Sequence, residues 1–309
     1  MTLLREPLLA AAGSSRLRRI AQDSPLVRPV VARFVAGTDE QDALRVMSEL
    51  LAGGLSVTLD HLGEDVADRA QAESNVVAYR SVLAALARSR VGPAAEVSVK
   101  LSAIGRSLPR DGRQIALDGA SRICEAAAAA NTTVTIDMED HAATDATLET
   151  VRELRADFDW VGVVVQAYLR RTEADCRDLA SGGSRVRLCK GAYAEPSSIA
   201  FHGAAVADSY RRCLDVLLAG TGYPMIATHD PAMIAAARAL VEQHRRSADS
   251  FEFQMLYGIR TGEQRAIAQA GNRMRVYVPY GQQWYGYFMR RLAERPANMR
   301  FFLRALTRR

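Results

Sequence analysis

Two adjacent arginines, Arg290 and Arg291, lie in the stretch 277–301, YVPYGQQWYGYFMRRLAERPANMRF. Tyr287, the two arginines and Glu294 are spaced i, i+3, i+4 and i+7, which places them on one face of a helix. Paired guanidinium groups framed by tyrosines and a carboxylate can bind a small carboxylate through two-pronged hydrogen bonds. A solvated amphipathic helix with an internal Arg–Glu pair is the alternative. The six aromatic residues in the first half of the stretch argue against it, because a solvated face has little use for them.

The same stretch predicts a short strand followed by a helix. The run RVYVP over 275–279 reads as a strand, which Pro279 and Gly281 end. The helix that follows is expected to run to about Arg295, where Pro296 stops it.

The two lysines of the chain are the second chemical signal. Of 40 lysine and arginine residues, only Lys100 and Lys190 are lysine, and both lie at the ends of predicted strands. The alternative is that these two lysines were kept by chance in an arginine-rich sequence, but their shared location at strand ends favours a functional role for both. Lys190 opens the sequence KGAY, in which Gly191 permits close backbone approach and the lysine suits an anionic cofactor. No phosphate-binding glycine motif follows a strand, so a Rossmann-bound nicotinamide cofactor is not expected.

These residues require elements that bring distant strand ends together. Eight short β-branched runs alternate with helical segments over about 250 residues, which is typical of a TIM barrel of the (β/α)8 type. The predicted strands are 55–60, 96–101, 133–137, 161–166, 185–189, 224–228, 251–255 and 275–278. The predicted helices are 67–88, 114–130, 143–156, 173–180, 197–219, 231–243 and 262–270. A doubly wound sheet is the alternative, although it more often stops at five to seven strands.

The predicted domain organisation is an N-terminal helical lead-in over 1–50 and one barrel domain over 51–309. The last helix follows the eighth strand directly, so it can lie across the barrel mouth. In a barrel the active site forms at the carboxyl ends of the strands. The polar residues expected there are Asp60, His61, Lys100, Ser102, Asp137, Glu139, Asp140, His141, Gln166, Arg187, Lys190, Thr228, His229, Asp230 and Tyr277.

Two other kinds of site would use residues at the same strand ends. Histidines and aspartates there are suitable metal ligands, but no H-x-H or H-E-x-x-H pair exists and lysines and arginines surround the position. No metal is therefore expected. Cys189 is a candidate nucleophile, but alternation would point its side chain away from Leu188 and Lys190, so a packed thiol is favoured.

Composition limits the cellular setting. The 309 residues are 49% hydrophobic and carry a net charge of +5, with arginines spread along the chain, so no nucleic-acid partner is expected. Four cysteines without a C-x-x-C pair suit a reducing cytosol. No apolar run approaches the roughly 18 residues of a membrane span, and Arg5, Glu6 and Pro7 interrupt any signal peptide. A cytoplasmic protein is expected.

The motifs together resemble one enzyme family, proline dehydrogenase, the flavin enzyme that opens proline catabolism. The resemblance covers roughly residues 50–303. Its motifs lie at the ends of seven predicted strands and follow the order of the family. The motifs are VKLSAIG (99–105), IDMEDH (136–141), VVVQAYLRRT (163–172), RVRLCKGAY (185–193), ATHD (227–230), FEFQMLYG (251–258) and YVPYGQQWYGYFMRRLAERPAN (277–298). The length implies the monofunctional form, without the aldehyde-dehydrogenase half of bifunctional relatives.

The resemblance implies a distorted (β/α)8 barrel that holds FAD noncovalently, with the last helix across the mouth. L-proline would be oxidised to Δ1-pyrroline-5-carboxylate, and the electrons would pass to a membrane quinone through peripheral contact at the inner face of the membrane. A separate pyrroline-5-carboxylate dehydrogenase would act downstream.

The resemblance also implies roles for individual residues. Asp137 and Arg187 would be catalytic, with Arg187 near the flavin N5, and Glu64 would pair with Arg290 to gate the site. The substrate would be bound by Lys100, Leu188, Tyr277, Tyr287, Arg290, Arg291 and Glu294. The FAD would be bound by Met138, Gln166, Arg187, Lys190, Gly191, Ala192, Thr228, His229 and Phe301. Many relatives have proline where this chain has Gly286, and glycine there is expected to loosen the start of the helix.

Two further alternatives stay open from the sequence. A methylenetetrahydrofolate-reductase-like barrel shares the fold and cofactor, but it would need a nicotinamide-stacking surface and no double-arginine helix. An arginine-rich nucleic-acid-binding protein would hold no flavin and would bind with strong salt dependence.

Overall fold

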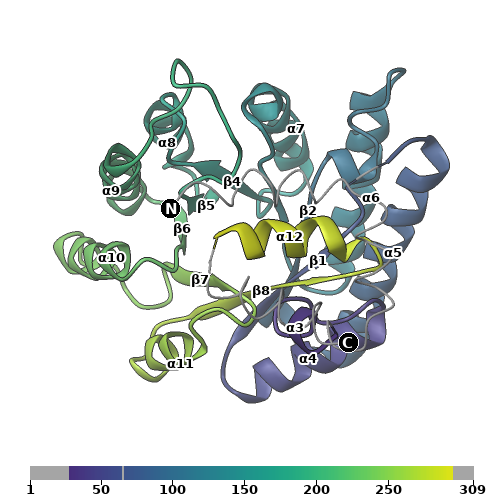
Figure 1. Ribbon diagram of the computed structural model, residues 1–309, viewed down its shortest axis with the longest axis horizontal. Helices are drawn as coiled ribbons and strands as arrows, with labels where there is room; N and C mark the ends of the chain where they lie inside the picture. The colour runs from purple at the N-terminus through teal and green to yellow at the C-terminus, as the bar shows by residue number, and fades with distance from the viewer. Residues whose placement is uncertain (1–27, 65, 295–309) are drawn as a thin grey trace, which may run out of the picture.

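Eight parallel strands pair in chain order and close into a barrel (Figure 1). The computed structural model describes residues 28–64 and 66–294. The strands are β1 (Ser56–His61), β2 (Ala95–Val99), β3 (Val134–Ile136), β4 (Gly162–Gln166), β5 (Arg185–Cys189), β6 (Tyr223–Ala227), β7 (Glu252–Leu256) and β8 (Met274–Tyr280). β8 pairs with β1, with Thr58 opposite Tyr277, so the sheet has no edge. The predicted (β/α)8 barrel is confirmed, and the doubly wound alternative is wrong because such a sheet stays open.

The strands are buried on both faces, which explains their nearly continuous apolar sequences. β4 reads GVVVQ and all five residues are buried. Within it, Val163 and Val165 belong to the core between strands and helices. Val164 lies level with Arg187 of β5 and faces the barrel interior with it. Alternation therefore separates an outer apolar layer from an inner layer that can carry charge.

Helices surround the strands on the outside of the barrel (Figure 1). They are α5 (Arg69–Ser89), α6 (Gly112–Ala129), α7 (Thr144–Asp157), α8 (Thr172–Leu179), α9 (Ala204–Ala219), α10 (Pro231–Gln243) and α11 (Thr261–Gln269). Aspartates cap two of them: the side chain of Asp68 accepts from the Gln71 amide and that of Asp230 from the Ala232 amide. α4 (Glu40–Ala52) packs against β1 and β8 and shares the main core. It therefore covers the outer side of these two strands, which the last helix of the chain does not cover.

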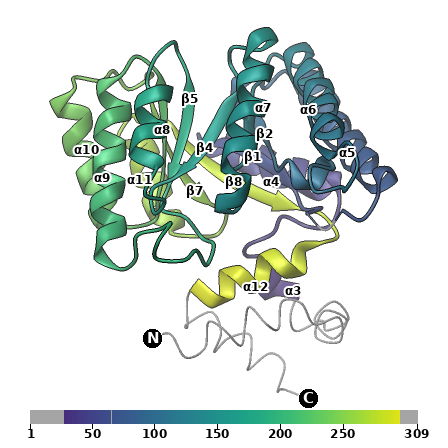
Figure 2. The same ribbon diagram turned by 90° about the horizontal axis from the view of Figure 1, so that it is seen from above.

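The last helix, α12 (Trp284–Glu294), lies across one end of the barrel beside α3 (Arg28–Val31) (Figures 1 and 2). Phe288 is fully buried in a second hydrophobic cluster with Phe34 and Trp284. Their ring centroids lie 6.3 Å and 5.8 Å from that of Phe288. This cluster fastens one face of α12 to the chain before the barrel, so the opposite face is directed at the barrel end.

Two predicted boundaries are wrong. The helix predicted from residue 197 begins at Ala204, because the preceding residues bond to the loop after β4: the Phe201 amide donates to the Tyr168 carbonyl at 2.7 Å. Pro279 does not end the last strand, which continues to Tyr280. The proline has no amide hydrogen, but its carbonyl still accepts from the Ala36 amide at 2.9 Å.

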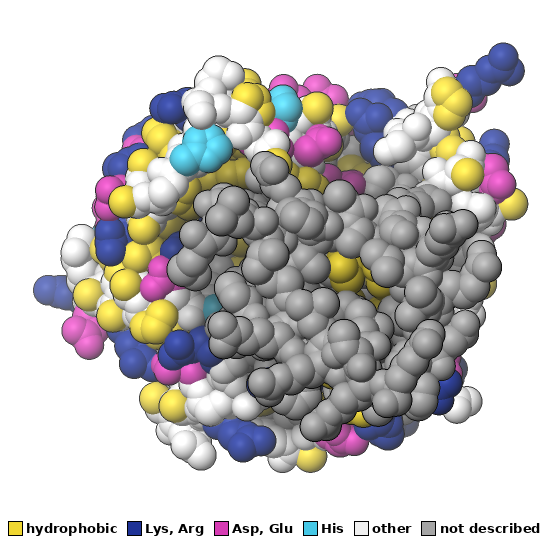
Figure 3. Space-filling view, in the orientation of Figure 1, with side chains coloured by type: hydrophobic (Ala, Val, Ile, Leu, Met, Phe, Trp, Pro, Cys, Tyr) yellow, Lys and Arg dark blue, Asp and Glu magenta, His cyan; other side chains and the backbone are white. Residues whose placement is uncertain are grey.

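On the described part of the face shown in Figure 3, acidic and basic side chains are interspersed over the outer helices. Across residues 28–64 and 66–294, every helix is too short or too polar to cross a membrane.

Candidate active site

A cavity of about 460 Å³ opens at the carboxyl ends of the strands, with residues of α12 in its wall. Its volume is within the range of small-molecule sites. Most of the predicted site residues meet there, although they come from six strands and one helix. These are Lys100, Asp137, Met138, Gln166, Arg187, Lys190, Gly191, Ala192, Thr228, His229, Tyr277, Tyr287, Arg290 and Arg291.

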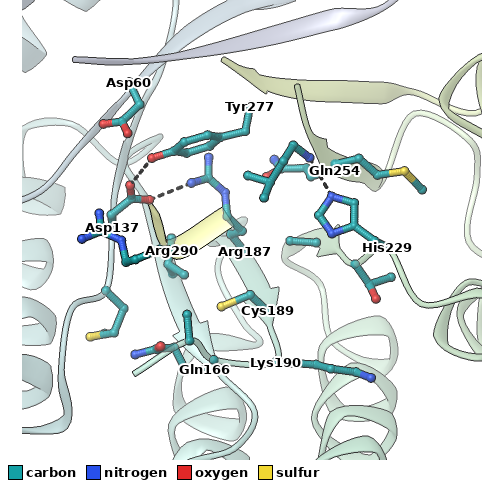
Figure 4. A pocket seen from close by; sticks show the side chains of 18 of the residues that line it. Asp60, Asp137, Gln166, Arg187, Cys189, Lys190, His229, Gln254, Tyr277 and Arg290 are labelled. Carbon is teal, nitrogen blue, oxygen red and sulfur yellow. Dashed lines mark hydrogen bonds and ion pairs between the residues drawn. The ribbon is translucent and has the colours of Figure 1, made fainter. Parts of the chain in front are cut away.

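Asp137, Arg187 and Tyr277 form the floor of the cavity (Figure 4). Arg187 Nη1 donates to Asp137 Oδ1 at 2.8 Å and to Ser98 Oγ at 3.0 Å. The Tyr277 hydroxyl donates to Asp137 Oδ2 at 2.6 Å. Burial would raise the pKa of Asp137, but Lys100, Arg187 and these hydrogen bonds together lower it. Asp137 is therefore a carboxylate that orients the arginine and the tyrosine.

Lys100 lies among carboxylates beside this floor. Its Nζ is 3.0 Å from Asp60 Oδ2, 3.4 Å from Asp137 Oδ2 and 3.6 Å from Glu64 Oε1. Although burial opposes its charge, Asp60 and the other anionic neighbours hold the pKa of Lys100 well above its ordinary value. Burial raises the pKa of Asp60. Lys100 is thus a cation that links the floor to the loop after β1.

The expected pair between Glu64 and Arg290 is present. Arg290 Nη2 donates to both Glu64 carboxylate oxygens at 3.1 Å, and so joins α12 to the loop after β1. Burial would raise the pKa of Glu64, but Lys100 and Arg290 lower it. The Arg291 guanidinium lies 5.3 Å from the centroid of the Tyr287 ring. Two adjacent guanidinium groups therefore border the cavity, as the helical spacing predicts.

The side of the cavity formed by β4, β5 and β6 offers cationic donors that suit an anionic cofactor. Gly191 has φ +108° and a Cβ there would lie 2.2 Å from the Tyr168 ring, so only glycine fits this close approach. Lys190 Nζ lies 2.6 Å from Asp230 Oδ2 at the start of α10. Arg187 Nε is buried and has no hydrogen-bond partner among the described residues. A buried donor of this kind is expected to meet a ligand.

The histidines considered for a metal site are far from forming one. His61 packs edge-on against the rings of Tyr79 and Tyr280, and His141 pairs with Glu195. His229 Nε2 accepts a hydrogen bond from the Leu256 amide at 2.9 Å. Within the described residues, no group of three or more potential ligands is arranged to hold a metal.

One prediction about β5 is wrong. Leu188, predicted to enclose the substrate ring, is fully buried in the core between strands and helices and does not line the cavity. Cys189, favoured as a packed thiol, packs against the main core and also lines the cavity, because it shares the inner face of the strand with Arg187. Burial raises the pKa of Cys189 to about 11, so it is a neutral thiol rather than an activated nucleophile.

Sequence reasoning missed several residues of the cavity wall, among them Tyr193, Gln254 and Leu256. Leu256 supplies the apolar wall expected of Leu188. It is the last residue of β7, and a position at the carboxyl end of a barrel strand predicts a place in the active site. Glu294 ends α12, but its side chain lies outside the described residues, as does Phe301.

A closed barrel with a charged cavity at the carboxyl ends of its strands defines a (β/α)8-barrel enzyme. The family model of proline dehydrogenase matches residues 43–304, and the chain belongs to this family. It is 39% identical over 275 residues to proline dehydrogenase 1 of Bacillus subtilis strain 168, which covers 89% of each chain. It is 35% identical over 307 residues to proline dehydrogenase of Deinococcus radiodurans, which covers 98% of each chain.

A solved structure agrees with these matches. The fold is similar to that of proline utilization A from Bdellovibrio bacteriovorus inactivated by N-propargylglycine, with a TM-score of 0.80 and 26% identity. The similarity covers 87% of this chain and 33% of that one. The chain is therefore an oxidoreductase of a flavin-dependent family that acts on proline, and the methylenetetrahydrofolate-reductase alternative is not favoured.

Proposed function

We propose that this protein oxidises L-proline to Δ1-pyrroline-5-carboxylate with a noncovalently bound FAD. The observation that carries the proposal is the position of Arg290 and Arg291 at the wall of a cavity floored by Asp137, Arg187 and Tyr277. In this arrangement Arg290 and Arg291 can bind a substrate carboxylate at the wall, and Arg187 provides a fixed cationic group at the floor.

The arginines of α12 would bind the proline carboxylate. Arg290 must then exchange Glu64 for the substrate, and Glu64 can keep its contact with Lys100, 3.6 Å away. Tyr277, Tyr287 and Leu256 would enclose the ring and exclude water, with Leu256 in the place first assigned to Leu188. Since the substrate amine must be neutral to react, activity is expected to rise with pH above neutrality.

The cofactor would lie against β4, β5 and β6. The residues proposed to hold it are Met138, Gln166, Arg187, Lys190, Gly191, Ala192, Thr228 and His229, with Phe301 near the adenine end by resemblance. When bound, the flavin supplies the acceptor for a hydride from carbon 5 of proline. Arg187 and Lys190 would place positive charge beside it, which favours the negative charge added on reduction.

The electron acceptor belongs to the same proposal. A membrane quinone would take the electrons through peripheral contact of a cytoplasmic protein with the inner face of the membrane. A separate pyrroline-5-carboxylate dehydrogenase would consume the product. The quinone, the membrane contact and the downstream dehydrogenase are all implied by the family resemblance.

An absorbance spectrum tests the proposal. The purified protein should be yellow, and its flavin absorbance should bleach when L-proline is added without oxygen. The methyl ester of proline, which lacks the carboxylate, should bleach it far less at the same concentration. A protein that stays colourless and inert after addition of FAD would contradict the proposal.

A further inference from the structure

One fully buried carboxylate has no part in the mechanism above. Glu96 lies on β2, two residues before Ser98 and four before Lys100, and alternation directs all three to the barrel interior. Ser98 contacts the floor of the cavity and Lys100 lines its wall. Glu96 lies one step deeper, behind the floor.

Glu96 is surrounded by cationic groups. Its carboxylate lies 2.9 Å from Arg185 Nη2, 3.4 Å from Arg187 Nη2 and 3.9 Å from Arg275 Nε. The Thr58 hydroxyl donates to Glu96 Oε1 at 2.8 Å. Burial would raise its pKa, but the three arginines, Arg275 foremost, lower the pKa of Glu96 to about 2. It is therefore an ionised carboxylate at neutral pH.

Glu96 and Asp137 hold Arg187 from two sides. Asp137 takes Nη1 at 2.8 Å and Glu96 takes Nη2 at 3.4 Å, so the two terminal nitrogens have different carboxylate partners. The plane of the guanidinium is fixed as a result, with its centre 5.3 Å from the centroid of the Tyr277 ring. Without Glu96, only Nη1 would be held, by Asp137 and Ser98, and Nη2 would lose its carboxylate partner.

We propose that Glu96 is a positioning residue for Arg187 that fixes the guanidinium and offsets part of its charge, and so sets the reduction potential of the bound flavin. The inference rests on the proposed function, because it takes Arg187 as the group that faces the cofactor. Glu96 does not line the cavity, so it acts through Arg187 alone.

The test is the reduction potential of the flavin in the Glu96→Gln holoenzyme, titrated without oxygen against a reference dye with dithionite as reductant. Glutamine keeps the shape of the side chain and removes its charge. Arg187 then carries more uncompensated positive charge, so reduced flavin should be favoured about tenfold, which is about 30 mV for a two-electron couple. The KM for proline should stay within about twofold, since the arginines of α12 are untouched.

Glu252→Gln is the matched control. Glu252 is also fully buried in the barrel, on β7, and lies 2.7 Å from Arg275 Nε, the guanidinium that Glu96 also approaches. Among the described residues, its side-chain partners are Arg275, Gln254 and Tyr223, and Arg187 is not one of them. This variant should leave the potential unchanged. Equal shifts in both variants, or no shift in Glu96→Gln, would overturn the inference.

Glu96→Asp serves if the glutamine variant does not fold. It keeps the charge but withdraws the carboxylate from Arg187, so the potential should rise by a smaller amount, and an unchanged value would again overturn the inference. Dithionite titration needs no proline, which separates the two hypotheses. A yellow wild-type protein that proline fails to bleach contradicts the proposed function alone, and bleaching with unchanged potentials contradicts only the role of Glu96.

Discussion

Arg290 and Arg291 are neighbours in the sequence but have different surroundings in the fold. Arg290 is bound to Glu64, so the substrate contact proposed for it would require an exchange of partners. Arg291 lies over the ring of Tyr287, within reach of a cation–π interaction with it. Arg290 is thus suited to couple substrate entry to the loop after β1, and Arg291 to hold the carboxylate in a fixed plane.

Arg291→Lys tests geometry rather than charge, because lysine keeps the positive charge but loses the planar fork. Hydrogen bonds to charged groups contribute roughly 1.5–3 kcal/mol each, so loss of one should lower kcat/KM by about ten- to a hundredfold. Most of the loss should appear in the KM for proline, with the FAD content unchanged. If Arg291→Lys and Arg290→Lys both kept the wild-type KM, the hypothesis that the two arginines bind the proline carboxylate would be wrong.

Lys190→Ala is expected to weaken FAD retention more than proline binding. The reason is that Lys190 lies beside Gly191 at the carboxyl end of β5, on the side of the cavity assigned to the cofactor. The measurement is the flavin-to-protein ratio after dialysis, with Lys190→Arg as a control that keeps the charge. A normal ratio together with a sharply raised KM for proline would place the lysine at the substrate instead.

At the scale of elements, α12 combines a firmly packed face with a glycine in its first turn. Phe288, Tyr285 and Met289 are buried, whereas a Cβ at Gly286 would meet nothing within 4 Å. Glycine weakens a helix by its backbone entropy. The first turn of α12, the helix that carries both arginines, is therefore less stable than it would be with alanine at position 286, although the space around that position would accept a methyl group.

Gly286→Ala should stabilise the protein by about 0.4–1 kcal/mol, seen as a rise of about 1–3 °C in Tm. Gly191→Ala is the contrasting variant. Its added methyl group would lie 2.2 Å from the Tyr168 ring at a backbone φ of +108°, so it should lose bound flavin. If Gly286→Ala lowered the Tm, the backbone at that position would not be helical.

At the scale of the whole molecule, the barrel interior is charged where barrels commonly pack branched apolar side chains. Glu96 on β2 and Glu252 on β7 form ion pairs with Arg185, Arg187 and Arg275 from β5 and β8. Buried charges are tolerated only when paired, and removal of one partner is strongly destabilising. The interior network therefore ties opposite sides of the barrel together and makes its stability dependent on pH.

The pH dependence of unfolding should reveal this network. The pKa of Glu96 is about 2 in the folded protein, below its ordinary value of 4.5. Its contribution, about 3 kcal/mol, is therefore fully present above about pH 4.5 and lost as the pH falls towards 2. The difference in unfolding free energy between wild type and Glu96→Gln, from denaturant titrations, should shrink over that range. A constant difference would mean that Glu96 does not hold its charge through the pairs described.

The sequence by itself determined the architecture and most of the cavity wall. Eight β-branched runs, most of them followed by polar residues, specify a barrel whose carboxyl ends carry Lys100, Asp137 and Lys190. Helical spacing alone placed Tyr287 and the arginine pair on one face. These conclusions depend on local periodicity and on the rule that parallel strand ends converge, and neither requires tertiary information.

The tertiary structure alone decided which face of each strand looks inward. Both faces of β5 are buried, so hydrophobicity does not distinguish the inner Arg187 and Cys189 from the outer Leu188. A choice of the wrong face exchanges every side chain along the strand, which is why Leu188 was misplaced and Leu256 missed. Pairs such as Arg290 with Glu64, 226 residues apart, exist only once the barrel has closed and α12 has folded across it.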